Sequence, residues 1–517
     1  MKNLKSVIFW GGVFITILTI ILVKPLSNLD EIWNFNIARC ISNGLIPYKD
    51  ISLVTTPLVG FITAIFLKIF GTEMFVTRIL AAILALINLI LIYRIFKKIE
   101  IPKSINMILI LIIAFIFKDY FCLDYNFFIL MITLIIILLE IRAIKKEKND
   151  IKIQIIIGIF AGLAFCTKQS IGVLICFFTF INLLFFIKQK NDSSKIFKNM
   201  LFRALGIIIP IIVFFIYLIS TDSLNGFIDY CISGIKTFSN KISYNHLMSS
   251  QTLLIKILSI CAPIILIICT IINIVTKCLK KEDKVFYLLN IYSIPIFTMI
   301  FPIADNIHFL IGIVPIFILL VWILQFFIKK YIKISGKYIF EFFEIASMLA
   351  IIMFTIYIEV KNGETLGNLS KYSKINNFKY IYISDSFMNS IEELGNYIQS
   401  SDKQVYILDA SSAVYMIPIN KYNKNYDMFN KGNFGSGGED SQIEKIKNEN
   451  AKYLIRSDNY STNWQNPEKI TNYVKENFEK IGNIGIYDIY ENTKINQENI
   501  QTDLPENTII QNEVPQN

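Results

Sequence analysis

The stretch LVTTPLVGFITAIFLKIF, residues 53–70, decides the fold of this chain. It is apolar except for Lys68, and similar apolar runs recur along the first 360 residues, several of them 18 residues or longer. A helix of that length crosses the hydrocarbon core of a membrane, which is about 30 Å thick. Whether residues 53–70 also cross determines the side of the membrane on which every later loop lies.

The composition indicates a multispanning membrane protein, since 54% of the 517 residues are hydrophobic and only 17% are charged. The formal net charge of +10 does not indicate a nucleic-acid partner, because the lysines and arginines gather in short loops, as in cytoplasmic connections. The 8 cysteines show no CxxC or Cys/His spacing, so neither a disulfide framework nor a zinc site is expected.

Apart from residues 53–70, we expect eleven membrane spans. The first follows Lys2 and Lys5 and lacks a small-residue cleavage pattern, so we interpret it as a retained anchor and not as a signal peptide. The expected spans are residues 6–23, 75–96, 104–118, 127–143, 152–167, 170–188, 201–220, 251–276, 285–303, 308–328 and 338–359.

The distribution of basic residues resolves the status of residues 53–70. If this stretch crossed the membrane, five basic loops would lie outside, against the positive-inside rule. We therefore expect a juxtamembrane helix, and Pro57 suits a helix that begins at the membrane surface. The five loops hold Lys97, Lys98 and Lys103; Lys145, Lys146 and Lys148; the lysines of 188–198; those of 277–284; and Lys329, Lys330 and Lys333.

This topology gathers the segments that carry polar chemistry on the outer face. They are Asp30 with Glu31, residues 119–126, residues 221–251, Asp305 with Asn306, and everything after the last span. We therefore expect the C-terminal domain to be extracytoplasmic.

The composition changes after about residue 360 to Asn, Lys, Tyr, Glu and Ser. We expect a membrane domain at 1–360, an α/β domain at 361–493 and a disordered tail at 494–517, which is poor in apolar residues. Expected strands are 380–383, 405–408, 453–455 and 484–490, and expected helices are 386–399, 441–449 and 467–479.

Two acidic groups are candidates for catalysis. Asp30 and Glu31 could simply be solvated charges that cap the next helix, because Asn28 and Asp30 are good helix starters. Charge at the membrane surface is otherwise costly unless it faces water, a partner or a substrate. Asp119 and Asp124 lie in the next outer loop, so the two groups can converge on one cavity and supply a base, with or without a metal ion.

Two basic side chains on the same face are candidates for binding. Lys168 ends a span rich in small residues, and it either extends along the membrane interface or holds a phosphate. Gly158 and Gly162 in that span indicate close helix packing. His308 either satisfies a backbone carbonyl or donates to an anionic headgroup.

In their order along the chain, these residues resemble the membrane-embedded GT-C glycosyltransferases. The similarity is to the bacterial protein O-mannosyltransferase and lipid A aminoarabinose transferase type, and it covers roughly the first 330 residues. The motifs that carry it are Asp30-Glu31 after the first span, the turn of Gly44, Pro47, Tyr48 and Asp50, Pro57, Gly71 with Arg78, Leu123-Asp124, Gly162-Leu163 to Thr167-Lys168, and Asn306 to Leu310.

The resemblance implies a polyprenyl-phosphate-linked sugar as donor and a glycan, lipid or protein acceptor on the outer face. Together with the retained anchor, it implies a multi-pass protein of the plasma membrane. It implies Asp30 as the catalytic base, with Glu31 and Asp124 as further acidic residues of the catalytic site. Candidate substrate contacts are Tyr48, Asp50, Arg78, Lys168 and His308. Attack opposite the phosphate would invert the sugar carbon. Whether the reaction needs a divalent cation stays open, because residues 119–126 contain no Asp-x-Asp.

Two other classes of protein remain as alternatives. A transporter or flippase of lipid-linked glycans would carry ionisable residues deep in its spans and two related halves. Here Arg203, Lys256, Glu341 and Glu344 lie near span ends, and no second half repeats the first. A structural or sensory membrane protein would tolerate replacement of Asp30 and Asp124.

Overall fold

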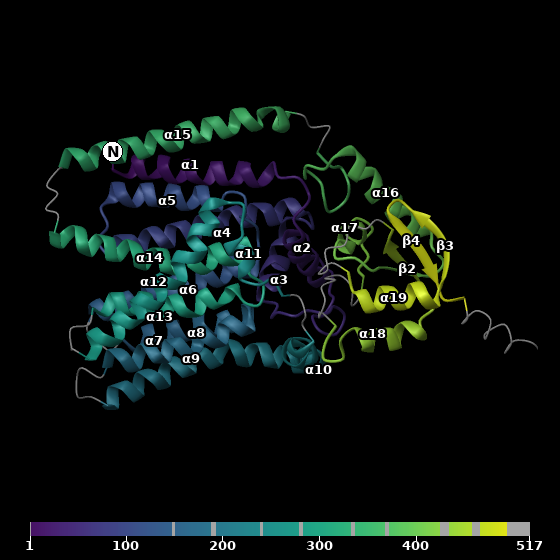
Figure 1. Ribbon diagram of the computed structural model, residues 1–517, viewed down its shortest axis with the longest axis horizontal. Coiled ribbons are helices and arrows are strands. Elements are labelled where there is room, and N and C mark those ends of the chain that lie inside the picture. Colours follow the sequence, from purple (N-terminus) through teal and green to yellow (C-terminus); the bar gives the residue numbers. More distant parts are fainter. Residues whose placement is uncertain are drawn as a thin grey trace, which may run out of the picture.

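The computed structural model describes residues 2–146, 150–187, 193–237, 241–278, 283–331, 337–367, 372–423, 434–457 and 466–493. A bundle of long helices forms one part, and a small α/β domain sits at one end of it (Figure 1). The expected tail at 494–517 lies outside the described residues.

Each of the eleven expected spans overlaps a helix, although residues 285–303 extend past α13, which ends at Phe297. Within the described residues, six helices, α1, α4, α6, α9, α12 and α14, are long and apolar enough to cross a membrane, and the other expected spans correspond to the shorter apolar helices α5, α7, α8, α13 and α15. The helices are α1 Lys2–Leu22, α2 Leu29–Ser42, α3 Leu58–Phe70, α4 Met74–Lys98, α5 Lys103–Phe117, α6 Tyr125–Lys146, α7 Ile151–Thr167, α8 Gln169–Ile187, α9 Ser193–Ser220, α10 Leu224–Phe227, α11 Asn245–Met248, α12 Leu253–Cys278, α13 Lys284–Phe297, α14 Asn306–Tyr331 and α15 Lys337–Gly367, with short π and 3-10 turns at Ile228–Ile232, Ser233–Lys236 and Thr298–Ile300.

Helix α3 begins and ends at the same end of the bundle, so it does not cross. Just before it, the Thr56 hydroxyl donates to the carbonyl of Phe165, near the C-terminal end of α7. Just after it, the carbonyl of Thr72 accepts a hydrogen bond from Asn377 of the C-terminal domain. These contacts agree with the prediction of a juxtamembrane helix at residues 53–70.

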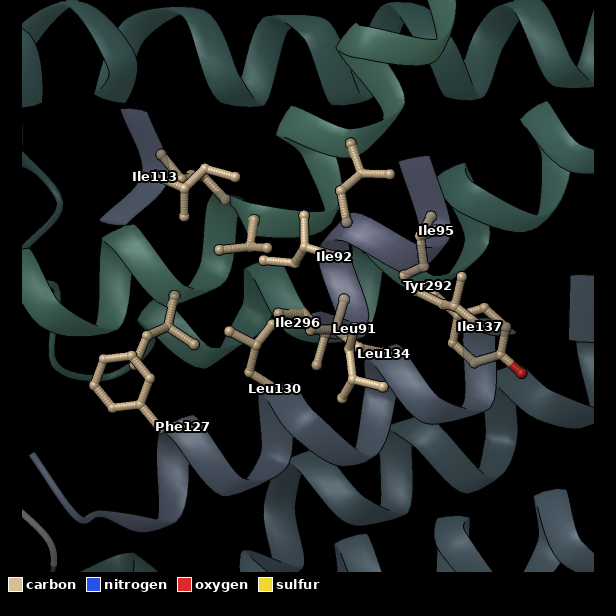
Figure 2. Packing of buried hydrophobic residues seen from close by; sticks show 14 of the residues in the cluster. Leu91, Ile92, Ile95, Ile113, Phe127, Leu130, Leu134, Ile137, Tyr292 and Ile296 are labelled. Carbon is tan, nitrogen blue, oxygen red and sulfur yellow. The ribbon is translucent and has the colours of Figure 1, made fainter. Parts of the chain in front are cut away.

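The core of the bundle lies where α4, α6 and α13 meet. Leu91, Leu130 and Ile296 interdigitate there, and branched aliphatic side chains fill most of the space (Figure 2). Elsewhere in the bundle, Arg203 of α9 and Glu140 of α6 form an ion pair at 2.7 Å, and both side chains are almost fully buried. We expected Arg203 near the end of a span, and the sequence does not indicate that it pairs with Glu140.

Helices α7 and α9 approach each other through glycines. A Cβ atom built on Gly158 would lie 2.2 Å from the carbonyl oxygen of Arg203, and one built on Gly206 would lie 2.3 Å from that of Ile155. Gly162 is equally tight, with 2.4 Å to the carbonyl oxygen of Ile207. The interpretation of Gly158 and Gly162 as packing residues is confirmed by these distances.

The C-terminal domain contains one mixed sheet with the strand order β1-β2-β4-β3. Strands β1 and β2 are parallel, and β4 pairs antiparallel with both β2 and β3. The strands are β1 Gln404–Ile407, β2 Ala451–Arg456, β3 Glu479–Ile484 and β4 Tyr487–Glu491, and the helices are α16 Asp385–Ser400, α17 Ser412–Met416, α18 Gly438–Lys447 and α19 Glu468–Asn477.

Two expected strands differ from the structure. Residues 380–383 make only isolated bridges, in which Tyr382 pairs with Pro25 and with Tyr372. The expected strand at 484–490 is the turn and second arm of a hairpin, because Gly485 at φ 53° reverses the chain between β3 and β4. The other expected strands and helices of this domain are confirmed.

Helix α2 joins the two parts of the molecule. Its apolar residues Ile32, Trp33 and Phe35 belong to the same buried cluster as the sheet of the C-terminal domain. Polar contacts reinforce the junction, since Arg39 Nη2 donates to the carbonyl of Lys421 at 2.6 Å. The C-terminal domain is therefore docked on the helix that begins with the Asp30-Glu31 pair.

Candidate active site

Asp30 and Glu31 lie in the first turn of α2, where Asn28 caps the helix. The Asn28 Oδ1 atom accepts hydrogen bonds from the backbone N–H groups of Asp30 and Glu31. Carboxylates in a first turn are also stabilised by the helix dipole. A helix does begin here, as the capping interpretation expects, but Asn28 is the cap, Glu31 is buried, and the two acidic side chains have different surroundings.

Glu31 is paired inside the protein. Its two carboxylate oxygens accept hydrogen bonds from Nε and Nη2 of Arg78 on α4, at 2.7 and 3.1 Å. Arg78 is fully buried and also donates to the carbonyls of Leu22 and Lys24. Arg78 therefore links α1, α2 and α4 through these hydrogen bonds. Because its guanidinium is fully buried, it has no surface exposed to a donor phosphate.

Asp30 is partly exposed, and its carboxylate has no hydrogen-bond or ion-pair partner among the described residues. Burial raises the pKa of Asp30 to about 6, and the negative charge of Asp124 acts in the same direction. The charges of His308 and Lys168 oppose this rise. Asp30 is therefore a carboxylate that faces the other charged candidates and is free to accept a proton.

Asp124 belongs to the same group of charges and is buried. Its Oδ1 accepts from the backbone N–H of Phe127 at 2.8 Å, which fixes the start of α6. Its Oδ2 accepts from Asn126 Nδ2 at 3.2 Å. Burial raises the pKa of Asp124, and these hydrogen bonds counteract the rise. Asp124 therefore anchors the start of α6, and its negative charge raises the pKa of Asp30.

Asn126 connects the two basic candidates. Its Oδ1 accepts a hydrogen bond from Lys168 Nζ at 2.9 Å, and its Nδ2 lies 3.3 Å from His308 Nε2. The Lys168 ammonium also lies 4.9 Å from the centre of the Tyr125 ring. Burial lowers the pKa of Lys168 to about 8, although three aspartates oppose the change. Asn126 was not predicted as a site residue, and its signal in the sequence is its place two residues after Asp124.

Asp305 orients the histidine. Its Oδ1 lies 2.8 Å from both the backbone nitrogen and Nδ1 of His308, at the start of α14. Burial would raise the pKa of Asp305, but the hydrogen bonds from the His308 side chain and backbone prevail and lower it. With Nδ1–H directed at Asp305, Nε2 faces Asn126 and the centre of the cluster. Asp305 was seen only as part of an outer loop, and its role as a partner was missed.

Tyr48 and Asp50 lie apart from this cluster. The Tyr48 hydroxyl donates to the carbonyl of Thr55, and Asp50 Oδ2 accepts from the backbone N–H of Ile46 at 2.7 Å. Tyr48 is buried and has a φ of 69°, so both side chains shape the turn before α3. The structure does not bring either of them to Asp30.

The carboxylates do not form a set of metal ligands in the described part of the chain, where no group of three or more His, Cys, Asp or Glu is suitably placed. Asp124 and Asp305 direct oxygens at Phe127, Asn126 and His308. We therefore derive no step through a metal ion.

Part of the chain matches a known protein family. Residues 54–218 match the family model described as dolichyl-phosphate-mannose-protein mannosyltransferase. This segment is less than half of the chain; it includes Arg78, Asp124 and Lys168, but not Asp30 or His308. No curated protein gives a significant match.

Two solved structures are similar to the whole chain. ArnT from Cupriavidus metallidurans bound to undecaprenyl phosphate has a TM-score of 0.56 at 10% identity, covering 94% of this chain and 98% of that one. Its apo state has a TM-score of 0.57 at 10% identity, covering 95% and 98%. The chain therefore has the fold of ArnT, that of a multi-pass membrane protein, and its residues 54–218 are similar to a mannosyltransferase family.

Proposed function

We propose that this protein transfers a sugar from a polyprenyl-phosphate-linked donor to an acceptor on the outer face of the plasma membrane, with Asp30 as the base. The observation that carries the proposal is the unpartnered carboxylate of Asp30, with a pKa of about 6, facing Lys168 and His308. A base with a pKa slightly below the working pH is deprotonated yet still accepts a proton effectively.

The chemistry needs few groups. Asp30 removes the proton of an acceptor hydroxyl while the oxygen of that hydroxyl attacks the anomeric carbon of the donor sugar. The bond between that carbon and the phosphate oxygen breaks. The electron pair of this bond leaves with the lipid phosphate, which needs no protonation. Attack from the face opposite the phosphate inverts the anomeric centre.

Lys168 and His308 are suited to stabilise the leaving phosphate. Lys168 Nζ donates one hydrogen bond, to Asn126, so further N–H groups are free to reach an anion. His308 is held by Asp305 at the same end of the bundle. A cation at this position stabilises the negative charge that grows on the phosphate, and it leaves Asp30 able to act as the base.

An apolar groove offers a place for the lipid tail. It has a volume of about 280 Å³, lies between α5, α12 and α14, and is lined by apolar residues that include Phe117 and Leu310. Leu310 lies two residues after His308, so the groove reaches the end of the bundle that holds the cluster. The similar ArnT structure binds undecaprenyl phosphate, and a groove of this kind suits such a chain.

The test is transfer from radiolabelled polyprenyl-phosphate sugars in membranes, with products followed into lipid, protein and polymer fractions. Asp30→Asn is expected to abolish transfer while donor binding is retained. Asp119→Asn is the matched control, because Asp119 is exposed and paired with Lys118. Retained transfer in Asp30→Asn would remove Asp30 from the base role. Movement of labelled lipid between leaflets without transfer would favour a flippase.

A further inference from the structure

A second cavity lies in the C-terminal domain, apart from the Asp30 cluster. Its volume is about 330 Å³, within the range of small-molecule sites, and it opens between α16 and the β3–β4 turn. Ser411, just after β1, and Arg456, the last residue of β2, both line it. It therefore sits at the carboxyl ends of two parallel strands, where open α/β sheets bind their ligands.

Buried polar groups form the floor of this cavity. Asp409 is almost fully buried, and its Oδ2 accepts from Arg456 Nη1 at 3.3 Å and from the Tyr487 hydroxyl at 3.2 Å. Its Oδ1 accepts from the backbone N–H of Ser411 at 3.0 Å. Because Asp409 holds its neighbours in place, Arg456 and Tyr487 present hydrogen-bonding groups to the cavity in fixed positions.

The charge of the lining favours a neutral ligand. Glu393 at the rim is exposed, and with Asp409 it places two carboxylates around the single guanidinium of Arg456. An anion would meet this excess of negative charge, whereas the hydroxyl groups of a neutral ligand can both donate and accept.

Apolar and aromatic side chains also line the cavity. Phe387 and Ile486 are among them, and Ile486 is 40% exposed. The Phe387 ring meets Tyr415 edge to face at 6.5 Å, and Tyr415 in turn meets Tyr487 at 5.8 Å. A lining that combines apolar and aromatic side chains with hydrogen-bonding groups matches a pyranose, which has C–H faces and a ring of hydroxyl groups.

We propose that this cavity binds a neutral sugar unit of the acceptor. Its role in acceptor selection rests on the proposed transfer reaction, but the binding itself does not. The segment Asp409 to Ser411 supports the link between the two sites. Ser411 lines the cavity, and the carbonyl of Ala410 accepts a hydrogen bond at 2.9 Å from Trp33, one turn after Asp30 on α2.

The test uses the full-length protein in detergent and four neutral disaccharides, maltose, cellobiose, α-1,6-mannobiose and N,N′-diacetylchitobiose, titrated by microscale thermophoresis. At least one is expected to bind saturably. Ser390→Trp, an exposed position on α16 that lines the cavity, is expected to weaken this binding tenfold or more. Asn389→Trp is the matched control, because Asn389 is exposed on the same helix but does not line the cavity.

The outcomes separate this proposal from the proposed function. Saturable binding that survives in Asp30→Asn and is lost in Ser390→Trp supports the cavity, even if no transfer is found. Absence of saturable binding by all four disaccharides overturns the cavity proposal, even where transfer occurs. Equal binding by the Ser390→Trp and Asn389→Trp variants overturns it as well, because the sugar would then lie elsewhere.

Discussion

Trp33 of α2 donates a hydrogen bond from its indole Nε1 to the carbonyl oxygen of Ala410 in the C-terminal domain, at 2.9 Å. Trp33 is buried and lies three residues after Asp30, on the next turn of the helix. The C-terminal domain therefore helps to fix the orientation of α2 and, through it, the position of the proposed base.

Trp33→Phe should reduce turnover without changing donor affinity. The variant removes one buried hydrogen bond, worth about 1 kcal/mol, while it keeps most of the packing. If that energy holds α2 in its productive position, kcat falls about fivefold and the KM for the donor stays the same. Trp322→Phe, on α14 where Trp322 stacks on Phe286, is the control and should leave kcat unchanged. An unchanged kcat in both variants contradicts the positioning role.

The rate of transfer should depend on pH as a bell-shaped curve. Burial raises the pKa of Asp30 to about 6, and the base must be deprotonated, so kcat/KM rises as the pH increases through 6. Burial lowers the pKa of Lys168 to about 8, and the ammonium must stay charged, so kcat/KM falls above pH 8.

The Lys168→Arg variant distinguishes the two limbs of this curve. A guanidinium stays protonated over the whole range, so the fall above pH 8 should disappear while the rise near pH 6 remains. The measurement is kcat/KM from pH 5 to pH 10 for both proteins. A fall at the same pH in the variant would mean that another group titrates there.

Arg78→Ala should strongly destabilise the protein. It leaves the buried carboxylate of Glu31 without its partner, and breaking such a pair costs about 3–5 kcal/mol. Lys49→Ala breaks a long, exposed pair with Asp222 and should cost about 1 kcal/mol or less. The midpoint of thermal unfolding in detergent measures both. Similar midpoints for the two variants would indicate that the Glu31 and Arg78 pair contributes little.

Gly158→Ala should weaken the contact between α7 and α9. The new Cβ would lie 2.2 Å from the carbonyl oxygen of Arg203, so the two helices must move apart. We expect a loss of about 1–3 kcal/mol, as for other overpacked sites. Gly11→Ala in α1 is the control, because a Cβ there meets nothing within 4 Å. The thermal midpoint should fall for Gly158→Ala and stay equal or rise for Gly11→Ala.

Part of the active site could be predicted from the sequence, because some of its signals are local. Asp30, Asp124, Lys168 and His308 were all candidates, and the structure brings them into one electrostatic cluster. Helix α2 was anticipated only as a helix that begins near Asp30, and its length was not predicted, since its 14 residues are too short and too polar for a membrane span. Asn126 was missed as a partner because its role depends on His308, a residue of another helix. Asp305 was missed although it lies only three residues before His308.

The sequence by itself determined the membrane bundle, the non-spanning helix at residues 53–70 and most elements of the C-terminal domain. Apolar length and the distribution of lysines act locally, so each segment carries its own signal. Only the tertiary structure decided which charges are paired. Glu31 meets Arg78 and Asp30 stays free because the packing of α1, α2 and α4 selects between two adjacent carboxylates.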